Sequence, residues 1–398
     1  MKIKAFLNYI VVAVIGITLF VACSKPAQGP APATKPPIKV GVIVAATGVR
    51  AGAGGPEKEG VVWAAEKINS KGGINGQKIE LVIEDDEGNE TNTASLARKL
   101  ATVNNVSAII GGTSIASTKV LGKTAEELKV PYLASMYGDL FINNGDRYSF
   151  SPWGLYNDEY TWYYQYLLKG QGWKKKVVIL HDATSSGQLA AKIAKDVLGP
   201  AGIEVVAEQY QVTDLEFAST WVKIKNARPD GVFLYGGTVP APAAIMKARM
   251  ETGNGNITVV AVPSVATKML VDLASPAALE GLVVVGSYFA FDPKTQPPAE
   301  KELFDIIAKS QGTGNYPAVY HGVTWDAMQI LAKAMETAGG DREKIVTAIH
   351  GIKNSTLALG THNFGPGDTM ADHTSLRVKD LKILKFESGA FRQVPYTP

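Results

Sequence analysis

The chain has 398 residues, of which 46% are hydrophobic and 19% charged, so its composition is that of a globular protein and its length suggests two domains. Its formal net charge of +3 is too small to indicate a nucleic-acid partner. The sequence contains a single cysteine, so the folded part must depend on its hydrophobic core rather than on disulfide bonds.

The N-terminus has the pattern of a secretory signal. Two lysines precede the apolar run Ala5–Ala22, and the lone Cys23 follows a small residue at the expected cleavage point. Leu19–Cys23 resembles the bacterial lipobox, whose cysteine is acylated and becomes the first residue of the mature protein, although Phe20 stands where leucine is usual. A transmembrane anchor is the alternative, because the apolar run nearly reaches the length that spans a bilayer.

We therefore expect a signal peptide over residues 1–22 and lipidation of Cys23. A Pro/Ala-rich tether over residues 23–37 follows, which has the composition of an extended linker. This predicts a lipoprotein anchored to a membrane outside the cytoplasm, in the periplasm or at the cell surface.

The folded part opens with a strand–loop–helix–strand unit. Ile38–Thr47 is apolar and β-branched, as expected of a parallel strand buried on both faces. The loop Gly48–Pro56 is rich in small residues, and we expect the helix to begin at Pro56, a residue that suits the first helical position. A second strand over Lys78–Gly88 completes a parallel βαβ unit. Its loop then lies at the carboxyl edge of the sheet, where open α/β folds bind small molecules.

Strands and helices continue to alternate. Further helices are expected over 91–103, 114–128, 158–168, 188–198, 217–227, 242–251, 299–310, 319–338 and 342–350, and strands over 107–112, 131–135, 175–182, 203–210, 231–237, 257–262, 282–289 and, as a β-like C-terminal part, from 375 onward. Two irregular segments, 136–154 and 291–298, interrupt this rhythm, as expected where a chain passes between domains. The pattern predicts an α/β fold with doubly wound parallel sheets.

Motifs for catalysis or cofactor binding are weak. Gly52 and Gly54 follow a strand as in dinucleotide-binding loops, but the third glycine of that motif is missing. A hydrolase in the cleft would need Ser114 or Ser186 within hydrogen-bond reach of His181. Triad partners usually come from different elements, so polar strand ends are the simpler interpretation. We expect neither an enzyme nor a cofactor.

Metal binding is also not expected from the sequence. His362, Asp368, Asp372 and His373 share one Gly/Pro-rich loop, where solvated turn formers are commoner than ligands. The acidic run Glu84–Glu87 lacks the spacing of a cation-binding loop and is better interpreted as a solvated strand end.

The strand-end loops, in contrast, share a composition of Gly, Ser, Thr and aromatic residues. They are Val49–Gly55, Thr113–Ser117, Ser135–Gly138, Ser151–Trp153, Ala183–Gly187, Tyr235–Pro240, Pro263–Ala266 and Ser287–Phe289. Backbone N–H groups, hydroxyls and rings at the carboxyl edges of two sheets are typical of a binding cleft. The sequence indicates capture of a small molecule without chemistry.

From Ile38 to the C-terminus the chain resembles the type I periplasmic binding proteins of branched-chain amino-acid ABC importers, the leucine/isoleucine/valine-binding group. The stretches that carry the resemblance are IKVGVIVAATG, EKINSKGGINGQKIELVIEDDEGN, AIIGGTSIAST, VPYLAS, VVILHDATSSGQ and GVFLYGGTVPAPAAIMKARMETG. The resemblance implies two lobes joined by a three-crossing hinge, residues 38–152 with 288–362 and residues 153–287 with 363–398. It also implies a monomer that closes on a solute and delivers it to ABC permease subunits. A sensory protein that presents its closed form to a signalling receptor is the alternative.

The family's amino-acid ligands transfer poorly onto this chain. The positions that hold the α-carboxylate read Ile115, Met136 and Gly138, and the position of the acid that pairs with the α-ammonium falls near Pro263. The family's aromatic and tyrosine positions read Ala53, Ser186 and Thr238, and its cysteine pair reads Gly88 and Ser114.

A buried ammonium without a carboxylate partner is costly, so we hypothesise an apolar or aromatic solute, such as an aromatic carboxylate, in place of a leucine-like zwitterion. Arg50 is either its anion partner or a solvated loop charge. Tyr137, Trp153 and Tyr288 either contact its ring or pack within the hinge and lobes. The full set of expected ligand-binding residues is Arg50, Ala53, Ser114, Ile115, Ala116, Ser135, Met136, Tyr137, Gly138, Trp153, Ser186, Tyr235, Thr238 and Tyr288.

Overall fold

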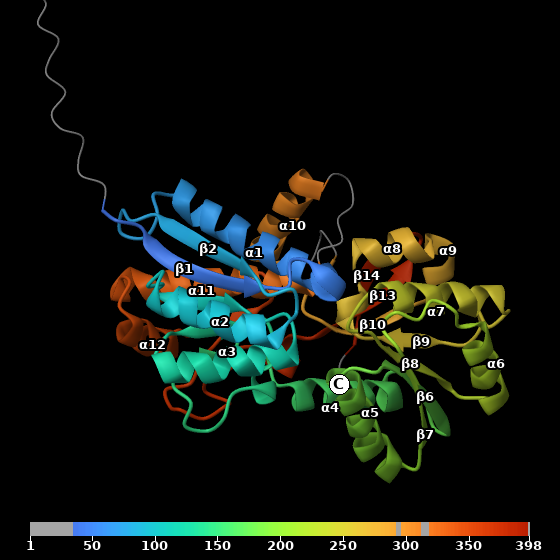
Figure 1. The fold of residues 1–398 in the computed structure, drawn as a ribbon. Coiled ribbons are helices and arrows are strands. Elements are labelled where there is room, and N and C mark those ends of the chain that lie inside the picture. Colours follow the sequence, from blue (N-terminus) through green and yellow to red (C-terminus); the bar gives the residue numbers. More distant parts are fainter. Residues whose placement is uncertain (1–34, 292–295, 312–317, 397–398) are drawn as a thin grey trace, which may run out of the picture. The chain divides into compact units, whose positions relative to one another are not determined.

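The computed structural model describes residues 35–291, 296–311 and 318–396 (Figure 1). The predicted signal peptide, Cys23 and most of the tether lie outside these residues. Every helix and strand described below belongs to one compact structural unit, Pro36–Pro398. Across the described ranges, none of the helices combines the length and the apolar character needed to span a bilayer.

The first sheet has five parallel strands in the order β2-β1-β3-β4-β5. These strands are β1 (Ile38–Val44), β2 (Ile79–Asp85), β3 (Ala108–Gly111), β4 (Tyr132–Ala134) and β5 (Ser149–Phe150). The interior strand β1 is buried almost throughout, which explains its continuous run of β-branched residues.

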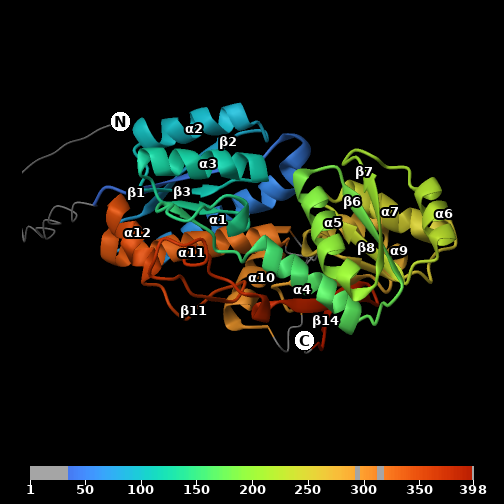
Figure 2. The same ribbon diagram turned by 90° about the horizontal axis from the view of Figure 1, so that it is seen from below.

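Helices cover both faces of this sheet (Figures 1 and 2). On one face α2 (Glu90–Thr102) packs beside α3 (Ile115–Leu128), and on the other α1 (Ala51–Ser70) packs along α11 (Val319–Ala338). The α1–α11 contact is close because Gly60 has no side chain: a Cβ there would lie 2.3 Å from the His321 carbonyl oxygen. The neighbouring α12 (Arg342–His350) packs on α11, so these late helices extend the layer begun by α1.

The second sheet has seven strands in the order β14-β13-β10-β9-β8-β6-β7, in which β6 to β10 are parallel and β13 and β14 are antiparallel. Its strands are β6 (Lys176–Asp182), β7 (Glu204–Tyr210), β8 (Gly231–Tyr235), β9 (Val259–Ala261), β10 (Val283–Ser287), β13 (Lys382–Glu387) and β14 (Ala390–Val394). The intervening helices are α4 (Tyr156–Lys169), α5 (Ser185–Leu198), α6 (Ala218–Ala227), α7 (Pro240–Glu251), α8 (Lys268–Ala274) and α9 (Pro276–Leu279), followed by α10 (Pro298–Gln311).

The strand order confirms the predicted α/β class with parallel sheets. The chain leaves the first sheet after β5 and returns to helices packed on α1 after β10. A two-stranded ribbon of β11 (Ser355–Thr356) and β12 (Thr361–His362) follows. The chain then passes residues 144–153, pairing Thr374 with Ser151, before it enters β13.

The expected start of the first helix is wrong. α1 begins at Ala51, and Pro56 lies inside it. The earlier start is possible because Gly54 lacks a side chain: a Cβ would lie 2.1 Å from the Ala45 carbonyl oxygen, so the first turn packs directly on the end of β1. Pro56 has no N–H to offer the carbonyl of Gly52, but Gly52 is exposed and that carbonyl can bind water.

The prediction that the acids of Glu84–Glu87 are solvated is also wrong for the two central residues, Asp85 and Asp86. Asp86 is fully buried and accepts hydrogen bonds from the Thr93 hydroxyl at 2.6 Å and the Gly88 N–H at 2.9 Å. Asp85 accepts the Ala46 N–H at 3.0 Å, and such hydrogen bonds lower the pKa of Asp85 despite its partial burial. The Asp85 carboxylate therefore joins the ends of β1 and β2, and the Asp86 carboxylate joins the end of β2 to α2.

Candidate functional site

A cavity lies at the carboxyl ends of strands from both sheets. Its volume is about 130 Å³. Its lining residues are Arg50, Thr113, Ser114, Ile115, Ala116, Met136, Thr184, Ser185, Ser186, Val212, Tyr235, Gly237, Thr238 and Tyr320. A second cavity shares Arg50, Gly237, Thr238 and Tyr320 with the first and adds Ala53. We refer to the two together as the polar cavity.

Four helix N-termini contribute to the lining of the polar cavity. Arg50 is the N-cap of α1, Ser114 caps α3 by accepting the Ser117 N–H at 3.0 Å, and Thr184 caps α5 by accepting the Gly187 N–H at 3.2 Å. Thr238 lies one residue before Val239, the N-cap of α7. Helix N-termini carry partial positive charge and unpaired N–H groups, so this arrangement favours an anionic group.

The charges of the lining residues also favour an anionic ligand. Arg50 is half-buried, and its methylenes lie over Gly88, where a Cβ would be 3.5 Å from Arg50 Cδ. Among the described residues, neither lining set contains an aspartate or glutamate, and the Arg50 guanidinium has no ion-pair partner. An arginine without a carboxylate, beside helix N-termini, is a recognition element for a carboxylate or similar anion.

Two buried acids support the walls of the polar cavity from behind. Asp182 accepts the Gly237 N–H at 2.7 Å and the Thr184 hydroxyl, which joins the loops after β6 and β8. Glu57 accepts the Thr113 hydroxyl at 2.6 Å. Burial raises the pKa of Glu57 to about 8, against the opposing effects of the Thr113 hydrogen bond and the positive charge of Arg50. Glu57 is therefore neutral over much of the physiological range and does not cancel the charge of Arg50.

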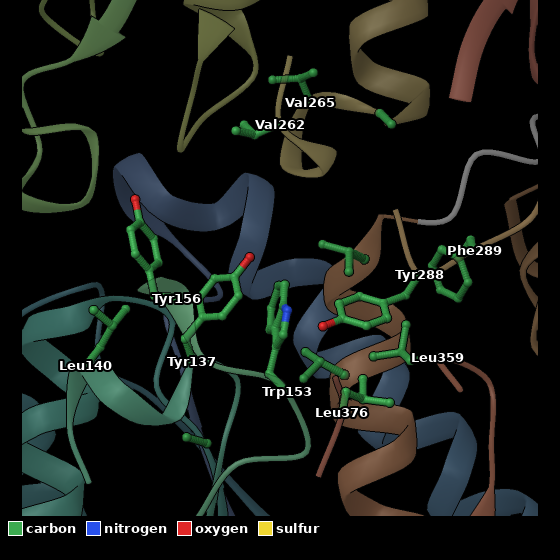
Figure 3. Packing of buried hydrophobic residues seen from close by; sticks show 14 of the residues in the cluster. Tyr137, Leu140, Trp153, Tyr156, Val262, Val265, Tyr288, Phe289, Leu359 and Leu376 are labelled. Atoms are coloured by element: carbon green, nitrogen blue, oxygen red, sulfur yellow. The ribbon is translucent and has the colours of Figure 1, made fainter. Parts of the chain in front are cut away.

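A small aromatic cavity of about 40 Å³ adjoins the polar one and shares Met136, Ser186, Tyr235 and Tyr320 with it. Its other lining residues are Tyr137, Trp153, Tyr156, Tyr160, Val262, Pro263, Ser264 and Val319. Figure 3 shows Tyr137, Trp153 and Tyr156 with their rings on the side of Val262.

The aromatic rings of this cavity support one another. The Tyr137 centroid lies 4.5 Å from that of Trp153 and 5.1 Å from that of Tyr156, and Tyr156 stacks on Tyr160 at 4.0 Å. The Tyr156 hydroxyl donates to the Ser186 carbonyl at 2.7 Å, which ties α4 to the start of α5. The Trp153 Nε1–H is buried without a hydrogen-bond partner among the described residues, so a donor remains available at this cavity.

Most of the expected ligand-binding residues meet in these cavities. Eight of them line the main cavity: Arg50, Ser114, Ile115, Ala116, Met136, Ser186, Tyr235 and Thr238. Ala53 lines the second cavity, and Tyr137 and Trp153 line the aromatic one. Ser135, Gly138 and Tyr288 line none of the three.

The three residues that line no cavity occupy other positions in the fold. Ser135 is buried behind the lining, and Gly138 opens a short 3-10 turn whose N–H donates to the Gly154 carbonyl at 3.2 Å. Tyr288 is buried, and its hydroxyl donates to Glu159. Tyr288 is therefore placed for packing between elements rather than for direct contact with a solute.

Sequence reasoning missed several lining residues. Thr184 and Ser185 lie in the predicted strand-end loop Ala183–Gly187 but were not among the expected ligand-binding residues. Tyr320 was assigned only to a packing helix, yet it lines all three cavities. No local signal marks Tyr320, because its helix reaches the site from a distant part of the chain.

The requirement for a hydrolase is not met among the described residues. The His181 Nδ1 contacts the Asp182 carbonyl oxygen at 2.8 Å, and the Ser114 hydroxyl donates to Ser117 at 3.0 Å. Neither Ser114 nor Ser186 makes a hydrogen bond to an imidazole within the described part of the chain.

The expectation of solvated turn formers in the 362–373 loop is wrong for its histidines. His362 is fully buried and bonds Ser375 at 2.7 Å and Asp326 at 3.0 Å. His373 is also fully buried.

Comparisons with known proteins identify the family and the fold. The sequence model of the periplasmic binding protein family matches residues 37–380. The chain belongs to that family. It is 26% identical over 332 residues to the leucine-, isoleucine-, valine-, threonine-, and alanine-binding protein of Pseudomonas aeruginosa, covering 82% of this chain and 85% of that protein. It is likewise 26% identical over 326 residues to Leu/Ile/Val-binding protein homolog 1 of Brucella suis, covering 78% of this chain and 82% of the relative.

Solved structures show the same fold. A leucine-binding protein of Thermotoga maritima superposes with a TM-score of 0.76 at 22% identity, covering 90% of this chain and 98% of that chain. A branched-chain amino-acid transporter substrate-binding protein of Streptococcus pneumoniae, in complex with isoleucine, gives 0.77 at 20% identity, covering 90% and 99%. These homologues are substrate-binding proteins and not enzymes, so this periplasmic binding protein is one of a class that captures a molecule without converting it.

Proposed function

We propose that this periplasmic binding protein is the lipid-anchored, extracytoplasmic receptor of an ABC importer. In this proposal it captures an apolar or aromatic carboxylate between two closing lobes and presents it to permease subunits. The observation that carries the choice of solute is the polar cavity, which combines Arg50 and four helix N-termini with an absence of acidic lining residues among those described. The adjoining aromatic cavity supplies apolar contact for the body of the same solute.

The proposed solute differs from the branched-chain amino acids named for the relatives. An α-amino acid brings an ammonium group into the cavity, and the described lining offers it Pro263 and Ser264 where a carboxylate would be required. A buried, unpaired charge is strongly unfavourable. A carboxylate without the ammonium avoids this cost and keeps the interaction with Arg50.

Two matched pairs of ligands test the proposal. Hydrocinnamate is phenylalanine without its ammonium group, and isocaproate is leucine without it. We expect each carboxylate to bind at least roughly tenfold more tightly than the amino acid of its pair, because the lining leaves the ammonium unpaired. Isothermal titration calorimetry on the purified protein measures both pairs, with benzoate as a shorter aromatic carboxylate. Tighter binding of leucine or phenylalanine than of its partner would reject the proposed solute class.

The lipid anchor is tested separately. Replacing Cys23 with serine removes the only thiol in the chain, so acylation cannot occur and the protein should move from the membrane fraction to the soluble fraction. Incorporation of labelled palmitate should be lost at the same time. A variant that stays in the membrane fraction would indicate that the apolar N-terminal run is retained as an anchor.

Capture of the loaded protein by its membrane partner decides between import and signalling. Crosslinking in the presence of the tightest ligand should recover permease subunits. Recovery of a signalling receptor instead would support a sensory role for the same cavity.

A further inference from the structure

A second cluster of polar side chains lies away from the cavities, where α12 ends beside the loop that follows β12. It consists of His350, the last residue of α12, with Asp368 and His373 from the loop. The nitrogen and oxygen atoms that these three residues offer all lie within 4.8 Å of one another. The His373 Nε2 is 3.8 Å from Asp368 Oδ1.

The backbone fixes the tautomer of both imidazoles. The His350 Nδ1 is 2.7 Å from the Gly365 carbonyl oxygen, and the His373 Nδ1 is 2.7 Å from the Ser149 carbonyl oxygen. A carbonyl oxygen can only accept a hydrogen bond, so each ring must donate from Nδ1. In a neutral imidazole the Nε2 atom then carries a lone pair. Hydrogen bonding of Nδ1 to a backbone carbonyl is also how metal-binding histidines are usually oriented.

The Nε2 of His373 has no hydrogen-bond partner among the described residues although the side chain is fully buried. One ring nitrogen of His350 and a carboxylate oxygen of Asp368 complete the cluster, in which the ligand atoms lie within 4.8 Å of one another. Three acceptors without a donor between them repel one another, and a cation among them removes that repulsion.

The ligand residues are held in place by their surroundings. Phe150 stacks on His373 with centroids 4.4 Å apart and contacts His350 edge-on at 5.2 Å. The Asp368 carbonyl accepts the Gly145 N–H at 2.8 Å, which attaches the loop to the segment before β5. Asp368 itself keeps 58% of its side chain exposed, which leaves an entry path and room to move toward the two imidazoles.

We propose that His350, Asp368 and His373 bind a divalent transition-metal cation, with Zn²⁺ as the best match. Two imidazole nitrogens and one carboxylate are a common zinc ligand set, with water in the fourth position, whereas Mg²⁺ and Ca²⁺ prefer oxygen ligands. Neighbouring ligand atoms around tetrahedral zinc are about 3.3 Å apart, so the ligand atoms, now up to 4.8 Å apart, must approach through movement of the half-buried His350 and the exposed Asp368. The bound ion would link α12 to the loop that leads into β13.

Calorimetric titration with ZnCl₂ tests the site on the full chain after treatment with EDTA. We expect one equivalent to bind, and the variants Asp368→Asn and His350→Gln to weaken that binding at least tenfold. Asp196→Asn is the matched control, since the Asp196 side chain is also 58% exposed but lies on α5, and it should bind as the wild type does. Circular dichroism spectra that match the wild type would establish that each variant is folded.

Substitution with Co²⁺ gives an independent signal. A four-coordinate nitrogen and oxygen site should produce visible absorption bands in the wild type and in Asp196→Asn, and these bands should be lost in His350→Gln. The proposal is wrong if the wild type binds no zinc, which would leave a proton as the only cation at the cluster. It is equally wrong if Asp368→Asn and His350→Gln bind zinc as tightly as the wild type, since the ion would then lie elsewhere.

Discussion

Replacing Arg50 with alanine is expected to weaken binding of hydrocinnamate roughly ten- to hundredfold, the effect of losing a charged hydrogen bond to a ligand. Arg50 lines both parts of the polar cavity, and no aspartate or glutamate among the described lining residues competes for its guanidinium. The loss should appear mainly in the dissociation rate. Calorimetry on the wild type and on Arg50→Ala measures the change in affinity.

The matched controls separate charge from packing. Arg98→Ala removes an exposed arginine of α2 that pairs with Glu127, and it should leave affinity unchanged. Hydrocinnamamide, the neutral amide of the same acid, should bind the wild type and Arg50→Ala with similar affinity, because it has no charge for Arg50 to neutralise. If Arg50→Ala binds hydrocinnamate as tightly as the wild type, Arg50 is a solvated loop charge and the proposed anion site is wrong.

The second large effect concerns stability as a function of pH. Glu159 is buried in α4 and accepts the Tyr163 hydroxyl at 2.8 Å as well as that of Tyr288. Burial raises the pKa of Glu159 to about 8, although these hydrogen bonds act in the opposite direction. Glu159→Gln should therefore be more stable than the wild type at pH 8, by roughly 2 to 4 kcal/mol.

The direction follows from proton linkage. In the unfolded chain a glutamate ionises near its ordinary pKa of 4.5, whereas folded Glu159 keeps its proton up to about pH 8. Between these two values the folded state binds more protons than the unfolded state, so the stability of the wild type falls as the pH rises through this window. Its stabilising contribution is fully present only below pH 4.5. Glu57 has the same window and adds to the slope.

Chemical denaturation at pH 4.5 and pH 8 measures the effect. The fall in unfolding free energy between these two pH values should be smaller in Glu159→Gln than in the wild type. Glu216→Gln, a change at an exposed position before α6, should follow the wild type at both pH values. Equal pH dependence in Glu159→Gln and the wild type would show that Glu159 is ionised in the folded protein.

The local sequence pattern was sufficient to predict the strands and helices and to predict that the cavity lies at the carboxyl edge of the sheets. Runs such as Ile38–Thr47 are apolar because parallel strands are buried on both faces, and their carboxyl ends must meet at one edge of a sheet. The small and hydroxylic residues that follow the strands, Ser114 and Ser186 among them, therefore predicted much of the lining. The start of α1 was mispredicted because Pro56 is a local signal, whereas the helix start is set by the approach of Gly54 to Ala45 across the βα junction.

The sequence by itself determined the α/β class, the family and a cavity edge that has an arginine but lacks the family's acid, since these depend on residue types read along the chain. Only the tertiary structure decided which acids are buried, that Tyr320 reaches the cavity and that His350 meets His373. Such contacts join residues far apart in the chain. Their burial depends on how helices pack on the sheets, and no local periodicity encodes that packing.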